Sequence, residues 1–77
     1  MKDFEYNYDG HKLVIGHVSG ASSTLKFHIM LDNFYHGEIW NTEHYGWQYW
    51  LQDDSPITGE EIESVIEDIK KATDEGG

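Results

Sequence analysis

Residues 57–73 read ITGEEIESVIEDIKKAT, and this segment predicts an amphipathic helix on which the rest of the chain depends. Its large apolar residues recur at the spacing i, i+3, i+4 and i+7, which places them on one face of a helix. They are Ile62, Val65, Ile66 and Ile69. Because β-branched residues lower helix propensity slightly, the helix needs another element to pack against.

The N-terminal end of this helix carries its own start signal. Thr58 is a good N-cap, and Glu61 three residues later completes the pattern of a capping box. Ile57 precedes the cap and is placed to pack on Ile62 as a hydrophobic staple. At the other end the helix is predicted to stop at Thr73, with Lys70 and Lys71 in its last turn and an ion pair between Glu67 and Lys71.

The preceding residues, 4–51, alternate between apolar and polar in the manner of half-buried strands. Strands are predicted at residues 4–8, 11–18, 24–31, 35–41 and 47–51, with a loop at 19–23. Asp9-Gly10 is a two-residue hairpin signal, and Asp32-Asn33 is a second turn. Gly37, inside the fourth strand, marks a bulge or a close approach of another backbone.

These elements predict an α+β fold: an antiparallel sheet of four to five strands, connected as a meander, followed by one C-terminal helix packed on one face. Residues 1–75 are expected to form a single domain, and residues 76–77 a frayed tail. The chain has 77 residues and no cysteine, so no disulfide stabilises it. Its 14% aromatic content supplies the apolar area instead.

The charge of the chain is strongly negative, with a formal net value of −10 from five lysines and fifteen acids. Direct binding to nucleic acid or to an anionic membrane is therefore not expected, since both need a basic surface. No apolar run is long enough to span a membrane and no signal peptide is recognised, so a cytoplasmic protein is expected. A cationic partner would be attracted to this chain.

The acids concentrate on and beside the predicted helix. They are Asp53, Asp54, Glu60, Glu61, Glu63, Glu67 and Asp68. A charge run of this kind is often a solvated surface only. The leading hypothesis is that it forms a binding site for a basic protein surface, which makes the chain a non-enzymatic binding module. In one form of this hypothesis the carboxylates imitate phosphates, and the chain inhibits a nucleic-acid-binding protein.

A second candidate surface is aromatic. Its residues are Trp40, Tyr45, Trp47, Tyr49 and Trp50. Alternation puts Trp47 and Tyr49 on one side of the last strand and Trp50 on the other, so at least one large ring lies off the helix-covered face. Rings of this kind cover the second face of a small sheet, stack on sugars, or join two copies of a chain. The alternative hypotheses are thus a small-ligand or carbohydrate binder and a dimeric structural domain.

Signals for catalysis or for a cofactor are absent from the sequence. No Gly-rich phosphate loop, cysteine nucleophile or G-x-S-x-G elbow occurs. Two pairs of residues, His36 with Glu38 and Glu43 with His44, are suitable in type for zinc, but their spacing matches no zinc motif. The sequence therefore predicts a chain that is not an enzyme and holds neither a cofactor nor a metal.

Overall fold

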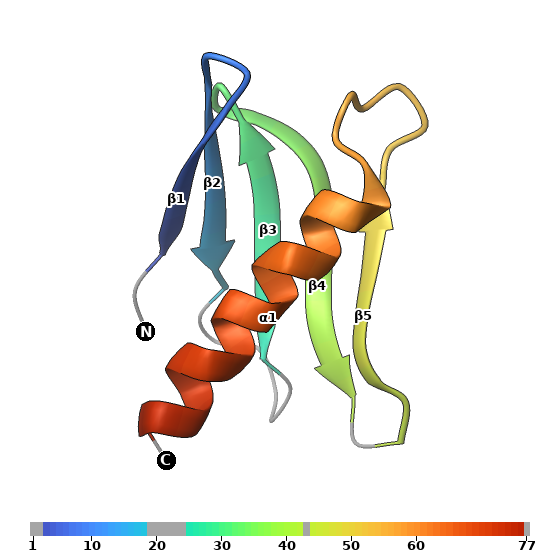
Figure 1. The fold of residues 1–77 in the computed structure, drawn as a ribbon. Coiled ribbons are helices and arrows are strands. Elements are labelled where there is room, and N and C mark those ends of the chain that lie inside the picture. The colour runs from blue at the N-terminus through green and yellow to red at the C-terminus, as the bar shows by residue number, and fades with distance from the viewer. Residues whose placement is uncertain (1–2, 19–24, 43, 77) are drawn as a thin grey trace.

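The computed structural model describes residues 3–18, 25–42 and 44–76, with side chains up to Thr73. It contains five strands in sequential order followed by one helix, as predicted (Figure 1). The elements are β1 (Phe4–Tyr8), β2 (His11–His17), β3 (Lys26–Leu31), β4 (Phe34–Thr42), β5 (Gly46–Leu51) and α1 (Gly59–Gly76). Every neighbouring pair of strands is antiparallel, so the sheet is a meander with the order β1-β2-β3-β4-β5. The predicted loop at 19–23, the strand start at Thr24, Glu43 and Gly77 lie outside the described residues.

Two tight turns set the registers of the first and third hairpins. Asp9 and Gly10 have φ angles of 50° and 83°, and Asp32 and Asn33 have φ angles of 51° and 70°. Positive φ at both central residues defines the type I′ turn, whose twist matches that of the flanking strands. Glycine, asparagine and aspartate are the residues that adopt this conformation at least cost. Both predicted turns are therefore confirmed.

The predicted irregularity at Gly37 is confirmed as well. Ile29 pairs with Gly37 and Met30 pairs with Tyr35, so His36 is an extra residue in β4. A β-bulge of this kind bends the strand. Gly37 also lies against the neighbouring strand, where a Cβ atom built on it would be 2.0 Å from the carbonyl oxygen of Trp50.

The helix begins as predicted but differs in two details. The Glu61 amide donates to Thr58 Oγ1 at 3.4 Å, which confirms the N-cap. The reciprocal half of the capping box is absent, because among the described residues no hydrogen bond joins the Glu61 carboxylate to the Thr58 amide; Glu61 Oε2 is buried without a partner. The predicted pair of Glu67 with Lys71 is also wrong, since Lys70 Nζ is the group that contacts Glu67 Oε2, at 3.5 Å.

The predicted end of the helix at Thr73 is wrong too. The helix continues to Gly76 because no glycine or proline interrupts it before that residue. Lys70 and Lys71 therefore lie one turn before the end rather than in the last turn, which contains no basic residue. In the described part of the chain, no helix is both long and apolar enough to cross a membrane.

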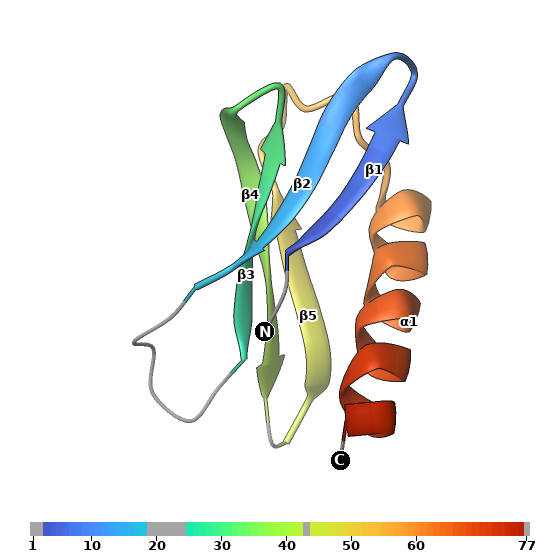
Figure 2. The ribbon, with the colours of Figure 1, turned by 90° about the vertical axis from the view of Figure 1, so that its left-hand side faces the viewer.

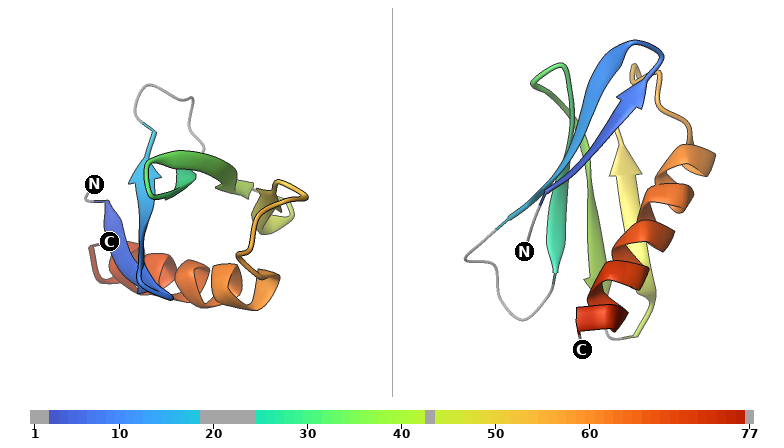
Figure 3. Two further views of the ribbon diagram at one scale, coloured as in Figure 1. Left: turned by 90° about the horizontal axis from the view of Figure 1, so that it is seen from above. Right: turned by 60° about the vertical axis from the view of Figure 1, so that its left-hand side comes forward.

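One hydrophobic core joins the sheet to the helix. The sheet contributes Leu13, Ile15, Phe27, Ile29, Leu31 and Ile39, and the helix segment contributes Ile57, Ile62, Val65, Ile66 and Ile69. Ile62 and Ile69 are fully buried, and burying one such side chain contributes about 1.5–3 kcal/mol. The helix thus lies on one face of a curved sheet and leaves the opposite face uncovered (Figures 2 and 3).

Candidate binding groove between the helix and the last strand

The acids of α1 lie on two different sides of the helix. At about 100° per residue, Glu60, Glu63 and Glu67 project within roughly 60° of one another. Glu61 and Asp68 project about 100° away from Glu60, on the side of β1. The division follows from the helical period, whereas which of the two sides faces β1 and which faces β5 depends on how the helix is rotated about its axis against the sheet.

Of the acids on the β1 side, Asp68 accepts a hydrogen bond from another element of the protein. Tyr6 Oη donates to Asp68 Oδ2 at 2.8 Å. This contact adds to the effect of burial, which is the larger cause, and together they raise the pKa of Tyr6 far above its ordinary value. Glu61 is half-buried and lines a small depression with Tyr6, Tyr8 and other residues of the first hairpin. Both acids thus lie on the side of α1 that faces the first hairpin.

The acids on the β5 side line an open groove of about 830 Å³. One wall belongs to α1 and consists of Glu60, Glu63, Ser64, Ile66, Glu67 and Lys70. The other wall belongs to β5 and the turn before it, and consists of Tyr45, Gly46, Trp47 and Tyr49. We call this site the acidic groove. Figure 1 shows the two elements that carry these residues, with α1 starting beside the C-terminal end of β5 and running diagonally away from it.

The structure therefore brings together parts of two surfaces that the sequence suggested separately. Tyr45 is 80% exposed at the rim, whereas Trp47 packs against the hydrophobic core. Tyr49 reaches across to the start of the helix, because a Cβ atom added to Gly59 would lie 2.4 Å from its hydroxyl oxygen. Aromatic faces and carboxylates both attract lysine and arginine, so the two walls favour the same kind of ligand.

The other predicted site residues lie away from the acidic groove. Asp53 and Asp54 are exposed in the connection between β5 and α1. Trp40 and Trp50 belong to the positions of β4 and β5 that face the uncovered side of the sheet. The predicted aromatic surface is thus divided between the two faces of the sheet.

On the uncovered face Trp50 has a neighbour that sequence reasoning missed. The ring of Tyr35 lies 6.5 Å from that of Trp50, with an interplanar angle of 32°, and 5.4 Å from the ring of His28. Burial is the main cause of a raised pKa at Tyr35. The only signal for this contact was Gly37, because the bulge beside it decides which residues of β4 share a face.

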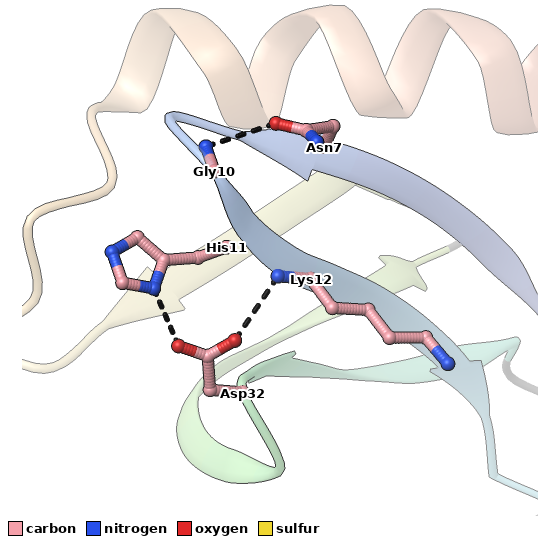
Figure 4. Close-up of polar contacts among 5 residues, drawn as sticks. All are labelled: Asn7, Gly10, His11, Lys12 and Asp32. Atoms are coloured by element: carbon pink, nitrogen blue, oxygen red, sulfur yellow. Dashed lines mark hydrogen bonds and ion pairs between the residues drawn. The ribbon is translucent and has the colours of Figure 1, made fainter.

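An imidazole and a carboxylate meet at the ends of the hairpins (Figure 4). His11 Nδ1 lies 2.5 Å from Asp32 Oδ2, and the Lys12 amide donates to Asp32 Oδ1 at 3.1 Å. The contact with His11, followed by the bond from the Lys12 amide, lowers the pKa of Asp32. Beside it, the Gly10 amide donates to Asn7 Oδ1 at 3.0 Å. The arrangement ties β2 to the turn between β3 and β4, which is a structural role.

The residues considered for zinc do not converge. His36 Nδ1 contacts Ser55 Oγ at 2.9 Å, while Glu38 binds Lys26 Nζ at 2.8 Å. Within residues 3–18, 25–42 and 44–73, no three side chains of histidine, aspartate or glutamate lie close enough to hold a metal ion. Glu43, which was considered with His44, is outside the described residues.

Comparisons of this chain with known protein families, with curated proteins and with solved structures gave no match.

Proposed function

We propose that this chain is a non-enzymatic binding module that receives a basic segment of a partner protein in the acidic groove. The observation that carries the proposal is the position of Glu60, Glu63 and Glu67 opposite Tyr45 and Tyr49. All three carboxylates are on one side of α1. Among the described residues, Lys70 is the one lysine that lines the groove with them, and it contacts Glu67 Oε2 at 3.5 Å. A lysine or arginine of the partner would meet carboxylates on one wall and aromatic rings on the other.

The shape of the acidic groove favours a polypeptide over a small molecule. Small-molecule sites enclose most of the ligand surface, whereas this groove is open along its length. From Glu60 to Glu67 the helix advances by about 10 Å, so the carboxylates are spread over the length of several residues. A spread of charges of this kind suits a polypeptide with several basic groups. The proposed partners therefore include proteins whose basic surface otherwise binds nucleic acid. For such a partner, the more specific proposal is that this chain acts as an inhibitor by competing with nucleic acid for the basic surface.

The magnitude expected of the charged contacts is moderate. An exposed ion pair contributes about 0.2–1 kcal/mol, and a cation above an exposed aromatic ring about 0.5–1 kcal/mol. Removal of three carboxylates should therefore weaken binding by roughly 3-fold to 150-fold at low salt. The binding should also weaken as salt rises, because the Debye length falls to about 10 Å at 0.1 M ionic strength.

The experiment uses a labelled peptide of alternating lysine and valine, acetylated and amidated, with the six-residue length of β5. We call it the Lys–Val peptide. Fluorescence anisotropy measures its affinity for the native protein and for a variant with Glu60→Gln, Glu63→Gln and Glu67→Gln. The matched control carries Asp9→Asn, Asp53→Asn and Asp54→Asn, which removes the same amount of charge away from the acidic groove. The groove variant should lose most of the affinity and the control little of it; equal losses in the two variants would refute the proposal.

The uncovered face supports the alternative of a sugar-binding or dimerising surface through one specific contact. Trp50 is 49% exposed and lies against Tyr35, which is 38% exposed. The two rings are tilted rather than coplanar, and Glu38 on the same face is already paired with Lys26. A change of tryptophan fluorescence on titration with mixed mono- and disaccharides, or a mass that rises with concentration in sedimentation, would favour this alternative.

A further inference from the structure

The last strand of the sheet has an edge that pairs with no other described strand. Among the described residues β5 pairs with β4 only, and the Gln52 amide continues that ladder by donating to the His36 carbonyl at 2.8 Å. Because backbone groups alternate along an antiparallel strand, the amides and carbonyls of Trp47, Tyr49 and Leu51 point away from β4. No backbone–backbone hydrogen bond outside the ladders reaches these three residues in the described part of the chain.

The two edges of the sheet differ in protection. β1 contains Glu5, which pairs with Lys12 at 3.2 Å, and is tied to the helix region by Tyr6 and Tyr8. β5 has the sequence GWQYWL, which includes no charged residue and no proline. Charges and prolines are the usual means of preventing another chain from pairing with an edge strand. The unprotected edge is therefore the one that borders the acidic groove.

A strand added to this edge would present its side chains alternately to the two faces of the sheet. Side chains opposite Trp47 and Tyr49 would point toward α1 and its acids. Residues two apart in a strand are about 6.8 Å apart. Basic groups at alternate positions would thus fall along the roughly 10 Å between Glu60 and Glu67. The remaining side chains would lie beside Gln48 and Trp50 on the uncovered face.

The net charge of the protein decides which kind of strand can pair with the edge of β5. A second copy of this chain would bring another net charge of −10 to an edge already lined by carboxylates. Like charges at this distance repel, so pairing of β5 with itself is disfavoured. We propose that β5 is extended by a strand from a partner protein, with lysine or arginine at alternate positions facing α1. This inference rests on the proposed function and adds the mode of binding to it.

The test compares the Lys–Val peptide with two N-methylated forms, one methylated on all lysine amides and the other on all valine amides. The two methylated peptides have the same charge, length and side chains, but each lacks the backbone hydrogen-bond donors along one edge of the peptide strand. In an antiparallel complex the lysines stand opposite Trp47 and Tyr49 and exchange hydrogen bonds with them, so methylated lysine amides should weaken binding about tenfold or more. In a parallel complex the valine amides carry those bonds.

A loss of affinity in only one of the two methylated peptides supports strand addition. Which peptide loses affinity shows whether the added strand is antiparallel or parallel to β5. Equal affinity of the two methylated forms, whether both weak or both strong, would overturn it. The proposed function has a separate test. It fails if the unmethylated Lys–Val peptide shows no salt-dependent binding, or if the variant at Glu60, Glu63 and Glu67 loses no more affinity for it than the control variant does. A peptide that binds in the groove but ignores the position of the methyl groups would leave the function standing without the added strand.

Discussion

Gly37 shows at the scale of one residue how a missing side chain shapes the sheet. Its Cα faces the Trp50 carbonyl of β5, and the bulge beside it decides which residues of β4 face the core. Gly16, in contrast, lies in β2, where an added Cβ atom would have Asp3 as its nearest neighbour at 3.9 Å, which is an ordinary contact distance. Only the first of these glycines is required by its surroundings.

We expect Gly37→Ala to destabilise the protein by about 1–3 kcal/mol, because a Cβ atom 2.0 Å from a backbone oxygen forces β4 and β5 apart. Urea unfolding followed by tryptophan fluorescence measures this difference. Gly16→Ala is the control and should be neutral or slightly stabilising, since alanine loses less backbone entropy than glycine on folding. A Gly37→Ala variant as stable as the Gly16→Ala variant would show that the two strands are not in close contact.

The contact of Tyr6 with Asp68 acts at the scale of elements, because it joins the edge strand β1 to the middle of α1. Tyr8 makes a second link by donating to the Pro56 carbonyl at 2.7 Å, just before the helix. The isoleucines hold the helix against the sheet, but apolar contacts are not directional. Directional bonds at β1 thus help to set how the helix is rotated, and with it which acids face the acidic groove.

The raised pKa of Tyr6 makes this link dependent on pH. The folded protein holds the hydroxyl proton more tightly than the unfolded chain, whose tyrosines titrate near 10.0. The stabilisation is therefore complete below pH 10 and declines as the pH rises from 10 toward the folded pKa. We expect Tyr6→Phe to lose about 1 kcal/mol at neutral pH, since Tyr6 is partly exposed and the bond has a charged acceptor.

Denaturant unfolding of the Tyr6→Phe variant between neutral and strongly alkaline pH checks this expectation. The difference in stability between native protein and variant should shrink above pH 10. Tyr45→Phe serves as the control, because Tyr45 is 80% exposed and the hydrogen bonds of the described residues do not include its hydroxyl. A constant difference across the whole pH range would mean that the proton of Tyr6 is not held by the fold.

At the scale of the whole molecule, charge repulsion opposes folding. The net charge is −10, and the described residues contain three lysine–carboxylate pairs, formed by Lys12, Lys26 and Lys70. Each such exposed pair contributes about 0.2–1 kcal/mol, and salt weakens it. Salt also weakens the repulsion among the many remaining acids, and this second effect should be the larger one because acids greatly outnumber lysines.

We therefore expect the melting temperature to rise with sodium chloride up to physiological ionic strength. For a chain of this size, each kcal/mol of added stability corresponds to about 4–8 °C. Circular dichroism measures the melting curves at several salt concentrations. The variant with Glu60→Gln, Glu63→Gln and Glu67→Gln should melt higher in low salt and respond less to added salt. A melting temperature that falls as salt rises would show that ion pairs outweigh repulsion.

Much of this molecule was determined by the sequence through local periodicity. Alternation such as Phe27, Ile29 and Leu31 identifies a strand with one buried face, and the spacing of Ile62 and Ile69 identifies the buried face of the helix. The type I′ turn at Asp9-Gly10 follows from backbone sterics within a few residues. These features, and with them the meander and its covering helix, depend on neighbours along the chain and are therefore visible in the amino-acid order.

The candidate site was decided by the tertiary structure. Whether Glu63 or Asp68 faces the acidic groove depends on the rotation of α1 against the sheet, and the pairing of Tyr35 with Trp50 depends on the bulge in β4. The sequence supplied the carboxylates, the rings and the periods that separate them, but not which side of α1 faces β5 or which rings line a groove with the acids. The physical reason is that such contacts join residues far apart in the chain, and packing of the shared core, rather than local backbone preference, selects them.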